Sequence, residues 1–159
     1  MEKRDEAFEE KMATVLHVYK EVNMINNGVI IPELKDTITI SFDEKPGMQA
    51  ISMTSEELPP VPGKHPSVTR DYEYKRLDTL SLLAGIDLHN DVVTETVSRT
   101  HNSDDFIVFL KKLDSSYPRE KKIRLILNNL RVHTSAKTRE YLLTVPNRFE
   151  FVFTPKHRS

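Results

Sequence analysis

Two polar clusters in this sequence each follow a predicted strand. Asp43 and Glu44 close a run in which every second side chain is apolar, the pattern of a strand with one buried face. Asn128 and Asn129 close a nearly continuous apolar run, the pattern of a strand buried on both faces. Open α/β sheets place their sites at the carboxyl ends of strands, so we expect the two clusters to form one site.

Other chemically capable side chains are given simpler interpretations. Glu44 faces away from Asp43 because side chains alternate along a strand, so we expect it to be solvated or to support the site rather than act as a ligand. Asp87 follows a predicted strand and is interpreted as a turn residue. No cysteine is present, which excludes disulfides, thiolate zinc sites and cysteine nucleophiles. Four histidines lack the spacing of a metal-binding pair: His65, His89, His101 and His157.

The elements that position these clusters follow from periodicity. Apolar residues between positions 5 and 23 recur at steps of three and four, which predicts a helix with one buried face. The proline-rich stretch 58–66 is expected to be an ordered surface loop. The other expected elements are a strand at 37–43, its hairpin partner at 48–53 after Gly47, strands at 77–86 and 92–97, a helix capped by Ser103, a strand at 123–127, a helix capped by Ser135 and a strand at 149–153. This order predicts a mixed sheet flanked by helices.

Length and composition limit the fold and the partners. The 159 residues, 38% hydrophobic and 30% charged, suit one compact domain with a sizeable core. No apolar run resembles a signal peptide or a membrane span, so we expect a cytoplasmic protein without membrane contact. The formal net charge is -1, so any contact with DNA must be local.

Four longer segments resemble a single family: Ser41–Ala50, Leu58–Pro66, Tyr72–Leu77 and Phe149–His157. They are similar to the DDE catalytic domain of mariner-like transposases of bacterial insertion sequences, over nearly the whole chain. The resemblance implies an α/β, RNase-H-like fold, a mixed five-stranded sheet of order 3-2-1-4-5 flanked by helices. It also implies a parent activity, cleavage and strand transfer of DNA at transposon ends. In the family, three carboxylates hold two Mg²⁺ or Mn²⁺ ions for this reaction.

The family's ligand set matches this chain only in part. Asp43 matches the first carboxylate, whereas Asn128 stands where the motif Asp-Asn-x-x-x-His has its metal-binding Asp. A neutral amide offers one carbonyl oxygen but neither the charge nor the bridge that two metals require. The third carboxylate would lie on a final catalytic helix beyond Ser159, which is missing from this sequence. We therefore expect Mg²⁺ or Mn²⁺ binding to be weak or absent.

Other residues match supporting positions of the family. Asn129 is expected to shape the turn through hydrogen bonds to the backbone. His133 is expected either to orient phosphate or water or to stabilise the turn. Six basic residues are either DNA or partner contacts or ordinary solvated charges: Lys64, Arg70, Lys75, Arg76, Lys156 and His157.

These observations predict a division of the chain and a function. Residues 1–28 are interpreted as an N-terminal helix and connector, and residues 29–159 as a truncated RNase-H-like DDE domain. We expect a catalytically inactive fragment of a DNA transposase; the alternative is a non-enzymatic module that binds DNA or an intact transposase. We also expect residues 149–153 to expose an apolar face that favours self-association, because the covering helix is missing.

Overall fold

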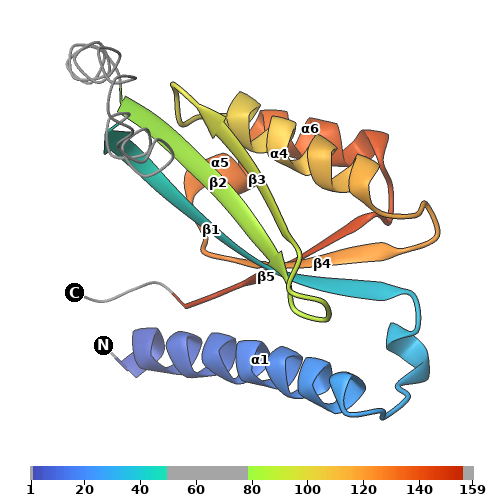
Figure 1. Ribbon diagram of the computed structural model, residues 1–159. Helices are drawn as coiled ribbons and strands as arrows, with labels where there is room; N and C mark the ends of the chain where they lie inside the picture. Colours follow the sequence, from blue (N-terminus) through green and yellow to red (C-terminus); the bar gives the residue numbers. More distant parts are fainter. Residues whose placement is uncertain (1, 50–78, 156–159) are drawn as a thin grey trace, which may run out of the picture.

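The structure is a computed structural model that describes residues 2–49 and 79–155, and its centre is a five-stranded sheet (Figure 1). The strands are β1 (Thr37–Gln49), β2 (Thr79–Asp87), β3 (Val93–Ser98), β4 (Lys122–Leu127) and β5 (Phe149–Phe153). Their order is β3-β2-β1-β4-β5. Pairing is antiparallel from β1 to β2 and from β2 to β3, and parallel from β1 to β4 and from β4 to β5. The expected mixed sheet, with its first and fourth strands adjacent, is confirmed.

Helices cover both faces of this sheet (Figure 1). On one side lie α4 (Ser103–Ser116), the short α5 (Arg131–Thr134) and α6 (Ala136–Thr144). On the other side lies α1 (Glu2–Asn26), and the 3-10 helix η1 (Pro32–Leu34) leads from it into β1. No helix in the described part of the chain is long and apolar enough to span a membrane.

β1 is longer than the sequence pattern predicts. Met48 and Gln49, expected in a hairpin partner after Gly47, continue β1 and pair with Leu80 and Thr79 of β2. The register shifts between residues 45 and 48, where Gly47 has a φ of 72°. The hairpin prediction was therefore wrong: a proline without an N–H followed by a left-handed glycine forms a bulge within a strand here instead of a turn. Residues 50–53 lie outside the described residues.

The main core lies between the sheet and α4. It comprises Ile40, Phe42, Leu83, Phe106, Phe109, Leu110, Leu113, Ile123, Leu125 and Leu127. Gly85 of β2 sits beneath α4, and a Cβ atom there would lie 2.8 Å from Ile40 Cγ2 and 3.0 Å from Phe109 Cζ. The helix therefore approaches β2 as closely as it does because residue 85 has no side chain.

α4 begins at a capping box one residue before the expected cap, Ser103. Asn102 Oδ1 accepts a hydrogen bond from the Asp105 N–H at 3.2 Å, and Asp105 Oδ2 accepts one from the Asn102 N–H at 2.9 Å. Ser103 lies in the first turn, and its Oγ contacts Ser135 Oγ at 2.6 Å. Ser135 itself caps α6, as expected, by accepting from the Thr138 N–H. The helix is thus confirmed, and only the predicted cap residue was wrong, because the reciprocal pair of Asn102 and Asp105 satisfies two free N–H groups at once.

α1 packs on the other face through a smaller apolar cluster. Val15 and Val18 of α1 contact Ile126 of β4 and Val152 of β5. Leu16, expected in the buried stripe, is 59% exposed. The sheet and the helix are also joined by Arg124, whose buried guanidinium lies 2.9 Å from Glu21 Oε1.

The uncovered apolar surface lies on β2 and β3 rather than on β5. Val152 is buried under α1, and Phe149, Phe151 and Phe153 pack against the main core, so the expectation of an exposed face at residues 149–153 was wrong. Helix α1 covers Val152 through Val15 and Val18. On β2 and β3, by contrast, several large apolar side chains are about half exposed: Ile86, Val93 and Val97.

Candidate catalytic edge of the sheet

Asn128 directly follows the carboxyl end of β4, whereas Asp43 lies in the middle of β1. The parallel ladder pairs Ser41 of β1 with Ile126 of β4, and Asp43 and Asn128 each stand two residues beyond that last pair. Tyr19 of α1 donates to Ser41 Oγ at 3.4 Å, so Ser41 and, by alternation, Asp43 face the α1 side. Both Asp43 and Asn128 are exposed. The structure thus places both residues beyond the same end of the β1–β4 ladder, and their joining into one site stays a prediction.

Glu44 is buried on the opposite face, with 4% of its side chain exposed. Its Oε1 lies 3.1 Å from Nε2 of His133, and its Oε2 lies 3.4 Å from Nε2 of His101. Of the two alternatives expected for Glu44, a solvated carboxylate is therefore wrong and a supporting role stays a prediction, whereas the expectation that Glu44 faces away from Asp43 was right. Sequence periodicity indicates a face, but it does not reveal that a loop and a helix cover that face.

His133 links this carboxylate to the backbone of Asn128. Its side chain is fully buried beside the rings of Phe42 and Phe106. Nδ1 lies 2.7 Å from the carbonyl oxygen of Asn128, and a carbonyl only accepts, so Nδ1 carries a proton. Nε2 then faces the Glu44 carboxylate at 3.1 Å, close but not aligned as a hydrogen bond.

The turn after β4 is held by backbone atoms and by His133. The Thr154 N–H donates to the carbonyl oxygen of Leu127 at 2.8 Å, and the His133 N–H donates to that of Leu130 at 3.0 Å. Asn129 is exposed, and its side chain makes no hydrogen bond to the described residues. The contact of His133 with the Asn128 carbonyl oxygen is of the turn-stabilising kind, and the alternative role in orienting phosphate or water stays a prediction. Asn129 contributes no side-chain hydrogen bond to the described part of the turn.

This fold and this pair of strand ends can be compared with known proteins. The family model of the DDE superfamily endonucleases matches residues 40–159. The chain belongs to this family. No curated protein matches the sequence significantly.

Solved transposase structures share the fold of this DDE-family chain. One is the crystal structure of the Mos1 mariner paired end complex with Mn, at 16% identity and a TM-score of 0.53, covering 98% of this chain and 44% of that one. Another is the Mos1 strand transfer complex, at 15% identity and a TM-score of 0.51, covering 100% of this chain and 43% of that one. The DDE-family chain thus has an RNase-H-like fold and spans less than half the length of these two transposase chains.

The donor atoms at this edge do not fit a pair of divalent metals. Asp43 supplies a carboxylate here, whereas Asn128 supplies only a neutral amide. Within residues 2–49 and 79–155, no three His, Asp or Glu side chains are arranged to hold a metal ion. Two hard cations close together require several anionic oxygens to offset their dehydration and mutual repulsion. One carboxylate and one amide do not supply that charge.

The basic residues predicted to contact DNA or a partner cannot be placed at this edge. All six lie outside the described residues: Lys64, Arg70, Lys75, Arg76, Lys156 and His157. Their roles remain those that the sequence suggests.

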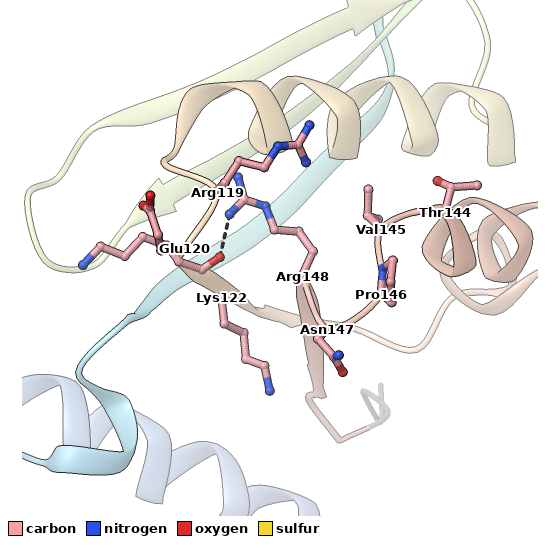
Figure 2. Close-up of a pocket in the computed structure, with 9 residues that line it drawn as sticks. Arg119, Glu120, Lys122, Thr144, Val145, Pro146, Asn147 and Arg148 are labelled. Carbon is pink, nitrogen blue, oxygen red and sulfur yellow. Dashed lines mark hydrogen bonds between the residues drawn. The ribbon is translucent and has the colours of Figure 1, made fainter.

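The opposite end of the sheet holds a basic pocket of about 330 Å³ between the turns that precede β4 and β5 (Figure 2). Arg148 lies at its base and is 5% exposed. Its guanidinium donates to Asp114 and to backbone carbonyl oxygens of the segment 114–121, including that of Lys121. This arginine therefore ties β5 to the end of α4, and it has no part in the edge that carries Asp43. No sequence pattern singled it out, because its acceptors are mainly backbone atoms.

Asp87, interpreted as a turn residue, has that role in the structure. It is 2% exposed, its Oδ1 accepts from the His89 N–H at 2.8 Å, and its Oδ2 accepts from the Tyr117 hydroxyl at 2.9 Å. The pKa of the Tyr117 hydroxyl is raised well above its usual range, mainly because the hydroxyl is buried. The hydrogen bond to Asp87 and the negative charge of Asp87 raise it further. Asp87 thus stabilises the β2–β3 connection by joining it to the end of α4.

Proposed function

We propose that this chain is the catalytic-type domain of a DNA transposase and that it does not cleave DNA as it stands. In this proposal residues 29–159 form the DDE-type domain, and residues 1–28 supply the helix packed on its second face. The supporting observation is that Asp43 and Asn128 each stand two residues beyond the last pair of the parallel β1–β4 ladder, on neighbouring strands of the sheet. The parent activity is metal-dependent cleavage and strand transfer at transposon ends, and Asn128 removes the charge on which that chemistry depends.

The proposal is tested by restoring that charge. Asn128→Asp places a second carboxylate beside Asp43, and one added negative charge about 4 Å from a divalent cation in water contributes ~2 kcal/mol. We therefore expect Mn²⁺ affinity, measured by calorimetry, to rise about thirtyfold. The matched control is Asn90→Asp, which adds the same charge at the exposed β2–β3 turn and should leave affinity unchanged.

Cleavage is measured separately on supercoiled DNA with Mn²⁺. The unaltered chain should leave the DNA intact. Nicking by the unaltered chain that Asp43→Ala abolishes would contradict the proposal, as would Mn²⁺ binding of equal strength before and after Asn128→Asp.

A second candidate function is a non-enzymatic module that binds DNA or an intact transposase. The uncovered apolar surface of β2 and β3 favours it, because single-domain proteins rarely leave neighbouring large apolar side chains exposed. Sedimentation velocity over a range of concentrations distinguishes the candidates. Association of the chain favours this module, and a monomer at every concentration counts against it.

A further inference from the structure

The ladder between β1 and β4 ends before the edge that carries the candidate site. Its last pair is Ser41 with Ile126, two residues short of Asp43 and Asn128. Beyond that pair β1 continues along β2, whereas β4 leads into the turn before α5. Backbone pairing alone therefore does not hold the two site residues together.

Side chains on the other face cross this gap. Glu44 follows Asp43 directly, and its carboxylate lies 3.1 Å from His133 Nε2. His133 Nδ1 in turn lies 2.7 Å from the backbone carbonyl oxygen of Asn128. Two short contacts thus connect the residue next to Asp43 with the backbone of Asn128.

The surroundings of these groups make the connection stiff. The side chains of Glu44 and His133 are 4% and 0% exposed, so neither exchanges its partner for water. His101, from the loop between β3 and α4, approaches the second carboxylate oxygen at 3.4 Å and holds Glu44 from the other side. An imidazole wedged beside Phe42 and Phe106 has little freedom to turn away.

We propose that Glu44 is a positioning residue, which sets the separation of Asp43 and Asn128 through His133. The role rests on the proposed function of that pair, but Glu44 itself points to the opposite face and binds nothing there. It is therefore not a substitute for the carboxylate that Asn128 lacks. It preserves the geometry of the strand ends by side-chain contacts where the ladder no longer does.

The absence of cysteine from the chain allows this separation to be measured without metal or activity. In the variant Asp43→Cys/Asn128→Cys, each cysteine stands two residues beyond the last pair of the β1–β4 ladder, and a disulfide forms only when the two positions come together. Its rate of formation under mild oxidation reports how often the two positions meet. A second pair, Thr37→Cys/Lys122→Cys, lies at the other end of the same ladder and reports whether the sheet is intact.

Glu44→Gln is then introduced into both cysteine variants. We expect disulfide formation between positions 43 and 128 to slow at least about fivefold, while the rate between positions 37 and 122 stays the same. Glu150→Gln, the same chemical change at a half-exposed carboxylate on β5, should alter neither rate.

The partner in the proposed link is tested by a double-mutant cycle. His133→Asn keeps a side-chain amide near the position of Nδ1 but cannot reach Glu44. It should slow the 43–128 disulfide, and adding Glu44→Gln should slow it little further, because both changes break one link. An unchanged 43–128 rate in Glu44→Gln, an equal fall in both cysteine pairs, or fully additive effects would each overturn the positioning role. None of these results depends on metal binding, so they leave the proposed function to its own test.

Discussion

Arg148 offers the sharpest test of how this fold is held together. Its guanidinium donates to five oxygens, at 2.8 Å to Asp114 Oδ1 and at 2.5–2.8 Å to the backbone carbonyl oxygens of residues 114, 117, 118 and 121. The residue is 5% exposed, so water does not replace these bonds easily. Arg148→Met keeps the length and the apolar stem of the side chain but leaves the acceptors, including the Asp114 carboxylate, without a donor.

The size of the effect follows from that burial. Removing one partner of a buried ion pair costs about 3–5 kcal/mol, because the remaining charge and carbonyl groups are desolvated without compensation. Domains of this kind are stable by only about 5–15 kcal/mol, so the loss is a large fraction of the whole. At about 2–4 °C per kcal/mol for a chain of this size, the melting temperature should fall by ~10 °C. The melting temperature of Arg148→Lys should lie between those of the unaltered chain and Arg148→Met, because an ammonium group cannot reach all five oxygens.

The assay is urea unfolding followed by circular dichroism, with Arg139→Met as the matched control. Arg139 lies exposed on α6, so its replacement should change the free energy of unfolding by no more than about 0.5 kcal/mol. If Arg148→Met were as stable as the control variant, the reasoning from buried hydrogen bonds would be refuted.

Two further predictions concern packing and pH. Gly85→Ala should lower the free energy of unfolding by about 1–3 kcal/mol in the same urea assay, because its Cβ would lie 2.8 Å from Ile40 Cγ2 of β1 and 3.0 Å from Phe109 Cζ of α4, so these packed side chains would have to move. An unchanged urea midpoint would show that they move at little cost in stability. Since the pKa of Tyr117 is raised in the folded protein, the unfolded chain ionises first, and stability should fall as pH rises above the usual tyrosine pKa of about 10. Tyr117→Phe should flatten this decline in thermal melts, and an equally steep decline in that variant would contradict the assignment to Tyr117.

Local pattern was sufficient for much of the fold and for the place of the site. The alternation at residues 37–43 is typical of a strand with one buried face, and the apolar run at 123–127 is typical of a strand buried on both faces. Strand β4 is buried over residues 123–127, as that run predicts. Asp43 and Asn128 could be assigned to one region from sequence because each closes a run that predicts a central strand, and neighbouring parallel strands share an edge. The structure continues β1 to Gln49, so only Asn128 follows the end of its strand. The family resemblance likewise depended on contiguous segments that can be read along the chain.

Features that depend on distant partners were missed or misjudged. The bulge near Gly47 was mistaken for a hairpin turn because its strand pairs with residues 79 and 80, far along the chain. Helix α1 was not expected to cover β5, since an amphipathic stripe shows that a helix has a buried face without showing which surface it buries against. Arg148 had no recognisable motif because carbonyl groups, which every residue carries, supply four of its five acceptors.

Asp43 and Glu44 of β1 show most clearly what the sequence determined and what only the tertiary structure decided. Their order along β1 determined that Asp43 and Glu44 face opposite sides, because backbone alternation is a local property. What lies on each side was decided only by tertiary structure: open surface beside Asn128 for Asp43, and two histidines for Glu44 from positions 57 and 89 residues further along. Burial and ion pairing depend on which segments meet in space, and that meeting is settled by the packing of the whole chain.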